Sequence, residues 1–167
     1  MNALARPAAL EISLETRFGI TDLYDAYSAA LDEGRYHDWA SFFTDDAVYR
    51  LTPRENHDRN LPIAIIYCDG KGMIEDRAFT TVETTIAQPR SLRHFVTGIA
   101  VRQIVDGGHE VWANFLVVQT MLDRGTEIVM SGRYVDRVVH DGRGFLFARK
   151  TCVSDTLLYP TSVVAPV

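Results

Sequence analysis

The sequence has few of the features that mark specialised protein classes. It contains only two cysteines, Cys68 and Cys152, and both lie in apolar, strand-like settings. Such cysteines are typical of buried, reduced thiols and not of a disulfide framework. No apolar run approaches the about 20 residues that a membrane-spanning helix requires. The chain has no basic run and a net charge of −5, which argues against nucleic-acid binding.

The first residues also lack the pattern of a secretory signal. Residues 1–12 carry one arginine and no long apolar core, so we expect a short disordered lead there. Hydrophobic residues make up 47% of the chain and charged residues 23%, which is ordinary for a globular protein. One domain is expected at this length, and we assign it to residues 13–167. These features together predict a cytoplasmic protein.

The first half of the sequence predicts helices. Apolar residues recur at helical spacing along a first helix, at Ile20, Leu23, Tyr24, Tyr27 and Leu31. Gly34 is expected to end this helix. A short second helix fits residues 36–43, and a first strand fits residues 47–52. A third helix fits Met73 to Ile86, before Pro89.

From Ser91 the apolar period changes from helical spacing to alternation. Four strand patterns follow, near residues 92–105, 109–122, 127–139 and 145–154, with Gly-containing turns between them. Helices followed by a long antiparallel meander predict an α+β fold. The strands exceed the usual about 5–6 residues, which predicts a strongly curved antiparallel sheet wrapped around the three helices. Neither face of the second of these strands is cleanly polar, so we expect helices on one face and a partner on the other.

The histidines and cysteines do not form a metal-binding pattern. A Rieske cluster requires two Cys and two His on paired loops, and neither cysteine lies near a histidine in the sequence. Asp106 precedes His109 by three positions, but Asn114 stands where a mononuclear iron site would need a second histidine. Adjacent residues rarely point at one target. Three further histidines each precede an aspartate and are interpreted as surface residues: His37, His57 and His140.

His94 is the histidine that the pattern places inward. It shares one side of an alternating strand with Leu92 and Val96. A lone inward histidine is more often a hydrogen-bonded core residue than a catalyst, and we interpret it in that way. The sequence has neither a Gly-x-Ser-x-Gly elbow nor a cysteine in an exposed, charged setting. Gly70 and Gly72 precede a helix but match no phosphate-binding motif, so helix capping explains them better.

The segment from Pro53 to Arg77 combines two polar clusters with an apolar middle that runs from Leu61 to Tyr67. Charged groups of both signs beside apolar residues suit a segment that docks onto another protein. The second cluster either joins this interface or pairs within the domain. The candidate interface residues are Arg54, Glu55, Asn56, Asp58 and Arg59 in the first cluster and Glu75, Asp76 and Arg77 in the second.

Short motifs extend from about Asp22 to Tyr159. They are Tyr27–Asp32, Trp39, Phe43–Ala47, Tyr49–Arg50, Arg54–Asn56, Leu61–Pro62, Gly72–Arg77, Arg93–His94 and Gly132–Tyr134. In this order and spacing they resemble the small (beta) subunit of Rieske-type aromatic-ring-hydroxylating oxygenases. The sequence departs from the family's pattern at Thr80, Gly98 and Ser154–Asp155, which affects local contacts and not the family.

This resemblance implies an NTF2-like cone and a non-catalytic subunit in a hexamer of three alpha and three beta subunits. The alpha subunit of the family carries the Rieske [2Fe–2S] cluster and the catalytic Fe(II), so the resemblance implies no cofactor on this chain. Electrons from NAD(P)H would reach the alpha subunit through a reductase or ferredoxin. The complex would hydroxylate an aromatic ring with O2. The sequence looks most like the subunits that serve aromatic acids such as salicylate or terephthalate.

The same fold also occurs in free-standing isomerases and dehydratases, which leaves two alternatives open. One is such an enzyme, with Tyr49 and His94 as polar groups in a pocket and Asp46 as a candidate base. The other is a non-enzymatic binding or scaffolding domain.

Overall fold

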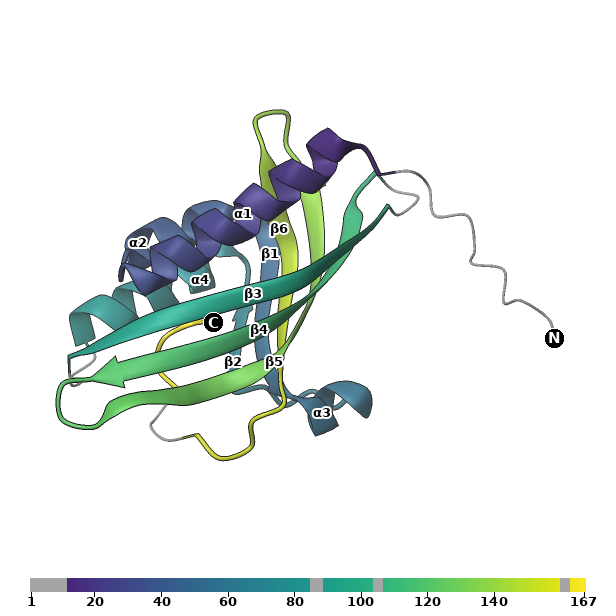
Figure 1. Cartoon of the computed structure of the whole chain (residues 1–167). Coiled ribbons are helices and arrows are strands. Elements are labelled where there is room, and N and C mark those ends of the chain that lie inside the picture. The colour runs from purple at the N-terminus through teal and green to yellow at the C-terminus, as the bar shows by residue number, and fades with distance from the viewer. Residues whose placement is uncertain (1–11, 85–88, 104–106, 160–162) are drawn as a thin grey trace.

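The computed structural model describes residues 12–84, 89–103, 107–159 and 163–167, and it consists of helices against one strongly curved sheet of six strands (Figure 1). The predicted lead falls outside these residues, except for Ile12. In chain order the elements are α1 (Leu14–Asp32), α2 (Tyr36–Trp39), η1 (Ala40–Phe42), β1 (Phe43–Pro53), α3 (Arg54–Asp58), β2 (Ile66–Asp69), α4 (Lys71–Phe79), η2 (Thr80–Thr84), β3 (Arg90–Gln103), β4 (His109–Met121), β5 (Gly125–His140) and β6 (Phe145–Ser154). The α+β class and the curved sheet are thereby confirmed.

The long helix α1 lies across the sheet (Figure 1). It begins at Ser13, whose side-chain oxygen accepts a hydrogen bond of 3.1 Å from the backbone N–H of Thr16. Gly34 follows the helix with φ of 70°, a conformation that glycine adopts without strain. The predicted apolar stripe is buried, at Ile20, Leu23, Tyr24, Tyr27 and Leu31.

The strands are arranged in the order β2-β1-β6-β5-β4-β3. The predicted meander corresponds to β3 through β6, with bounds close to those expected. Neighbouring strands are antiparallel except β1 and β6, which run parallel with Leu51 opposite Cys152. The prediction of a wholly antiparallel sheet is corrected at this pair. Alternation within a strand indicates which face is buried but does not identify the neighbour.

Two short elements, α3 and β2, were not predicted. Both lie in the segment from Pro53 to Arg77, where short charged and apolar runs obscure any period. The third helix is also shorter than predicted, because α4 ends at Phe79 and a π-helical turn follows. The hydroxyls of Thr80, Thr81 and Thr84 in this turn each donate to the carbonyl four residues earlier, a bond that often distorts helices. Residues 85 and 86 of the predicted helix lie outside the described residues.

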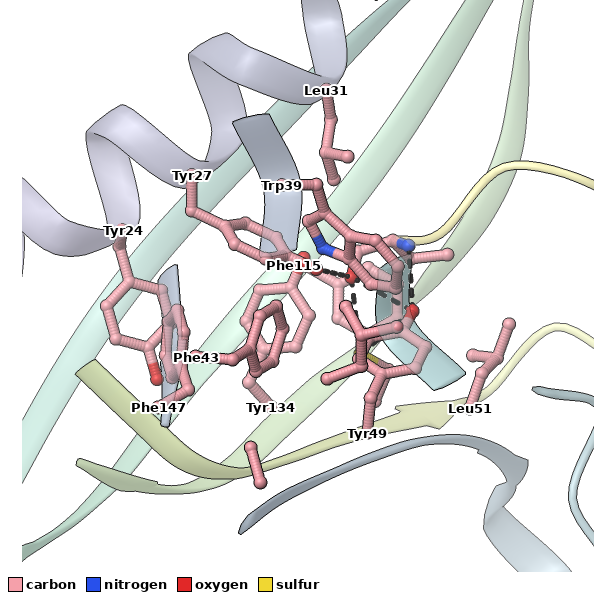
Figure 2. Close-up of a cluster of buried hydrophobic side chains, with 14 of the residues drawn as sticks. Tyr24, Tyr27, Leu31, Trp39, Phe43, Tyr49, Leu51, Phe115, Tyr134 and Phe147 are labelled. Carbon is pink, nitrogen blue, oxygen red and sulfur yellow. Dashed lines mark hydrogen bonds between the residues drawn. The ribbon is translucent and has the colours of Figure 1, made fainter. Parts of the chain in front are cut away.

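Aromatic side chains fill the space between α1 and the sheet (Figure 2). Tyr24 and Tyr27 of α1 meet the ring of Phe147 edge-on, with centroids 5.2 and 5.4 Å away. Trp39 packs edge-on against Tyr49 at 5.0 Å. Such pairs contribute about 0.5–1.5 kcal/mol each beyond the area that they bury. They fix the helices on the sheet.

Lys150 lies at the centre of this aromatic core and is fully buried. Its Nζ is 3.4 Å from the centroid of the Tyr134 ring and 3.1 Å from Oδ2 of the buried Asp136. The hydroxyl of Tyr24 donates to the same carboxylate oxygen, and the backbone N–H of Thr151 donates to the other at 3.0 Å. Opposite charge, hydrogen bonds and ring faces together offset the cost of removing this pair from water.

Replacing Lys150 by methionine would leave the carboxylate of Asp136 buried without its cation. We expect the free energy of unfolding to fall by about 3–5 kcal/mol, measured by urea denaturation. The double variant Lys150→Met/Asp136→Asn should recover much of this loss, because it removes both charges, keeps an oxygen for the N–H of Thr151 and offers its NH2 to the hydroxyl oxygen of Tyr24. Equal stabilities of the single and double variants would contradict the role given to the charge pair.

Candidate functional site

The first polar cluster lies at one end of the cone, on α3 and the residues that follow it (Figure 1). Arg54 reaches the segment after β6, where its Nε lies 2.6 Å from Oδ1 of Asp155. Asp58 accepts a hydrogen bond of 3.2 Å from Nη2 of Arg133 on β5. These two contacts tie α3 to the sheet and to the chain that leaves it. Asp155, which sequence reasoning assigned no role, is therefore part of this surface.

A further ion pair lies within this cluster, between Arg59 and Glu55 at 2.8 Å. All the side chains of these pairs are exposed to solvent to a large extent. Exposed ion pairs contribute at most about 1 kcal/mol each to stability. The fold therefore does not depend on them, and they are accessible to a partner.

The loop after α3 holds the backbone of an exposed apolar residue in place. The backbone carbonyl of Ile63 accepts hydrogen bonds from Arg50, Thr52 and Asn56, at 3.3, 3.1 and 3.2 Å. The side chain of Ile63 is nevertheless 69% exposed. A pre-ordered apolar group loses little entropy when a partner covers it. Asn56, one of the predicted interface residues, thus acts first within the domain.

Two more exposed apolar residues lie in the segment that follows β6. Leu157 is 73% and Leu158 91% exposed, and they follow Asp155, the partner of Arg54. The segment that carries them leaves β6 near α3 and runs away from it (Figure 1). We call the surface formed by residues 54–65 and 155–158 the docking surface. It combines charges of both signs with exposed apolar groups, as interface rims and anchors do.

The second polar cluster lies on α4, apart from α3 (Figure 1). The side chains of Glu75 and Asp76 are exposed, and their role in an interface remains a prediction. Arg77 is half-buried, and its Nη2 donates to the backbone carbonyls of Val164 at 2.6 Å and Val163 at 3.5 Å. Arg77 therefore pairs within the domain, which was one of the two roles left open for it.

Residues 163–167, which we call the strap, fill the interior of the cone beside Tyr49. The backbone N–H of Val167 donates to the hydroxyl of Tyr49 at 2.9 Å, and its carbonyl accepts from the hydroxyl of Tyr27 at 2.7 Å. The thiol of Cys152 donates to the same carbonyl at 3.3 Å. Figure 2 shows such hydrogen bonds beside the ring of Tyr49. The strap was not predicted, because its short apolar sequence has no period.

The three pocket residues of the enzyme alternative are not brought together. Tyr49 is fully buried and bound to Val167. Asp46 is exposed on the other side of β1 and accepts a hydrogen bond of 2.8 Å from Thr44. His94 points inward, as predicted, and its Nδ1 is bound to Asp32. Among the described residues, no pocket contains these three side chains.

The donor groups do not fit an iron centre. Within the described ranges, no three His, Cys, Asp or Glu side chains gather where they could hold a metal ion.

Both cysteines are free and buried. Burial raises the pKa of the Cys68 thiol, and it raises the pKa of the Cys152 thiol to about 12. No helix in the described part of the chain is long and apolar enough to cross a membrane.

These thiols should resist alkylation in the folded protein. At mildly alkaline pH the thiolate of Cys152 is a very small fraction of the total, because its pKa is about 12. We therefore expect iodoacetamide to modify neither cysteine until the chain is unfolded, with mass spectrometry as the measurement. Rapid labelling of Cys152 in the native chain would show that the strap does not cover it.

The chain is similar to known proteins over most of its length. Residues 27–159 match the model of a family described as the ring hydroxylating beta subunit. The chain belongs to this family. It is 30% identical over 154 residues to the small subunit of anthranilate 1,2-dioxygenase from Burkholderia cepacia, with 92% of this chain and 96% of the relative covered. The predicted resemblance is thereby confirmed.

Two further relatives agree with this assignment. Subunit beta 2 of the terminal oxygenase component of terephthalate 1,2-dioxygenase from Comamonas is 28% identical, with 84% of this chain and 92% of the relative covered. The beta subunit of an aromatic-ring-hydroxylating dioxygenase from Novosphingobium aromaticivorans has a solved structure. It superposes with a TM-score of 0.84 at 32% identity, covering 94% of this chain and all of that one. The NTF2-like cone is the fold of this beta-subunit family.

Lys150 and Asp136 are buried polar residues that sequence reasoning missed. The pairing of Arg137 with Arg149 and of Val138 with Phe147 leaves Ala148 as an extra residue in β6. This bulge reverses the alternation after it, so that Lys150 points inward. Strict alternation from Phe147 places Lys150 in solvent, and no other signal in the sequence marks the bulge.

Proposed function

We propose that this chain holds the large (alpha) subunit of a Rieske-type oxygenase in register and takes no direct part in its chemistry. The observation that carries the proposal is the docking surface, in which fixed polar groups surround exposed apolar side chains. The interior of the cone, where the fold's enzymes hold substrate, is filled by the chain's own aromatic side chains and strap. A subunit of this kind contributes an outer surface and not an active site.

We further propose an alpha subunit that carries a Rieske [2Fe–2S] cluster and a mononuclear Fe(II), in a hexamer of three alpha and three beta subunits. The donor groups of the described residues, which fit neither centre, support this division. A reductase or ferredoxin would deliver electrons from NAD(P)H to the alpha subunit. The complex is proposed to act in the cytoplasm.

The proposed substrate of the complex is an aromatic acid that is hydroxylated with O2. Two relatives support this class, because anthranilate and terephthalate, named in their descriptions, are both carboxylates of an aromatic ring. The substrate would bind in the alpha subunit.

Partner binding should gain energy from two sources at the docking surface. Covering Ile63 and Leu157 removes apolar area from water, at about 25 cal/mol per Å². Ion pairs such as Arg54 with Asp155 lose their solvent screening when they are covered, so each charge must then be matched. The same pairs that barely affect the isolated fold would therefore matter strongly in the complex.

Substitutions on this surface should separate assembly from folding. We expect Ile63→Asp to reduce co-purification with the alpha subunit by at least about ten-fold, because it places an unpaired charge among apolar groups. Arg54→Ala should weaken co-purification as well, since truncating a covered ion-pair partner costs about 2–5 kcal/mol. Neither change should alter the thermal midpoint of the isolated chain by more than a few degrees.

Arg143→Ala is the matched control. Arg143 is an exposed arginine that pairs with Asp141 in the turn between β5 and β6, far from α3 (Figure 1). It should assemble like the wild type. Undiminished co-purification of both Ile63→Asp and Arg54→Ala would contradict the assigned docking surface.

The iron content of the isolated chain and of the complex tests whether the alpha subunit alone binds the iron centres. The isolated chain, refolded or expressed without the alpha subunit, should bind less than stoichiometric iron after exchange into metal-free buffer. The co-expressed complex should retain iron and the absorption of a [2Fe–2S] cluster. Stoichiometric iron in the isolated chain, measured by plasma emission spectroscopy, would overturn the proposal.

A further inference from the structure

A buried aspartate–histidine pair lies where α1 meets β3. The Nδ1 of His94 is 2.7 Å from Oδ1 of Asp32, and the backbone N–H of His94 donates to both oxygens of the same carboxylate, at 3.0 and 3.2 Å. The side chain of His94 is only 1% exposed. Arg93 stands 3.6 Å from the other side of the carboxylate. The imidazole is therefore held by its contact with Asp32, and the backbone of His94 is bound to the same carboxylate.

This arrangement fixes which ring nitrogen carries the proton. A carboxylate only accepts hydrogen bonds, so Nδ1 of His94 must donate to Asp32. In the neutral ring Nε2 then carries a lone pair and acts as an acceptor. Nε2 is buried and has no hydrogen-bond partner among the described residues. A buried acceptor without a donor is destabilising, and a ligand with a hydroxyl group would supply the missing donor.

His94 lines a small cavity between the sheet and the strap. The cavity measures about 30 Å³, which is room for one water molecule. Its sheet side carries apolar residues together with His94, Gln119 and Arg90, and its other side is the strap itself. Gln119 in the wall is already paired, to Arg90 and Glu127. The apolar lining residues are Leu92, Val117, Val129 and Met130 from the sheet and Val163, Val164, Ala165 and Pro166 from the strap.

Side chains of the domain bind the strap's backbone near both of its ends, and Val167 is buried in the core. Arg77 binds the carbonyls of Val163 and Val164, and the backbone of Val167 is bound by two tyrosine hydroxyls and a thiol. If the strap withdrew, its apolar volume would become free space beside Nε2 of His94. The hydroxyls of Tyr27 and Tyr49 would also lose their partner on Val167.

We propose that the space beneath the strap is a binding site for a phenol. The phenol's hydroxyl donates to Nε2 of His94, and its ring takes the place of the strap against Leu92, Val117 and Met130. A phenol fits better than an aliphatic alcohol because its more acidic O–H is the stronger donor to an imidazole nitrogen, and its ring matches an apolar wall. Asp32 is a positioning residue, since it acts on the ligand only through the imidazole.

The proposal is independent of docking to an alpha subunit, because it concerns the interior of this chain and is tested on the chain alone. We choose p-cresol as the probe and 4-methylanisole as its matched control, which has the same ring but no hydroxyl donor. Calorimetric titration of the wild type should show p-cresol binding at least ten-fold more tightly than 4-methylanisole. Equal affinities for the two compounds, or no binding of p-cresol, would overturn the proposal.

Two substitutions locate the site. Arg77→Ala loosens the strap and should tighten p-cresol binding at least ten-fold, because the strap competes with the ligand. Adding His94→Leu to Arg77→Ala should lower the affinity for p-cresol at least ten-fold, because leucine has no acceptor, and should leave the affinity for 4-methylanisole unchanged. Arg59→Ala, on the docking surface, should have no effect on either. An unchanged affinity in Arg77→Ala, or equal p-cresol binding with and without His94, would contradict the site.

A measurement on the wild type guards against variants that do not fold. Nitrogen-15 NMR of the histidine rings reports which nitrogen carries the proton. His94 should show a protonated Nδ1 and an unprotonated Nε2, and the Nε2 signal should move when p-cresol is added but not when 4-methylanisole is added. A protonated Nε2 in the neutral ring, or an Nε2 signal that does not move when p-cresol is added, would overturn the assignment.

Discussion

The structure depends on filling the interior of a strongly curved sheet. A sheet of six strands that bends this far encloses a volume too large for one layer of aliphatic side chains. The chain fills it with large aromatic residues from α1, η1 and the strands, and with one buried ion pair. A polar atom inside is stabilised when it has a partner within the protein, because no bulk water reaches it. Tyr24, Asp136 and Lys150 satisfy one another, and Tyr27 and Tyr49 are satisfied by the strap.

Charged residues inside the cone therefore affect its stability differently from those on its outer surface. Inside, a single unpaired charge costs several kcal/mol, so the residues are interdependent. On the outside, the ion pairs around α3 are solvated and nearly free to change without loss of fold. A surface whose groups are not needed for folding can be shaped for a partner. The docking surface and the aromatic core are therefore governed by different constraints within one small fold.

The parts of the fold that could be predicted are those with a long period. The stripe from Ile20 to Leu31 is helical over several turns, and the strands of the meander alternate over long stretches, so both were found with nearly correct bounds. α3 and β2 are too short to show a period. The parallel pairing of β1 with β6 was missed because each strand's pattern reports burial and not its neighbour.

For the candidate sites, local sequence was informative to different degrees. The mixed composition of residues 53–77 predicted a docking segment, which stays a prediction, and alternation correctly placed His94 inward. The partners of these residues could not be predicted, because Asp155, Asp32 and Val163 are distant in sequence and only the tertiary fold brings them close. Arg77 was grouped with its charged neighbours by sequence. Successive side chains of a helix point in different directions, so Arg77 points inward to the strap while Glu75 and Asp76 face solvent.

The chain after β6 contributes both to the docking surface and to the strap. After β6 the chain first meets α3 through Asp155 and presents Leu157 and Leu158 outward. It later returns as the strap, with Val167 between the hydroxyls of Tyr27 and Tyr49. The strap carries no side-chain polar group, so its backbone makes every hydrogen bond that holds it. Backbone bonds tolerate changes in side chains but not shifts in position. The strap's placement therefore depends on Arg77, which binds its first residues, and on the tyrosines that bind Val167.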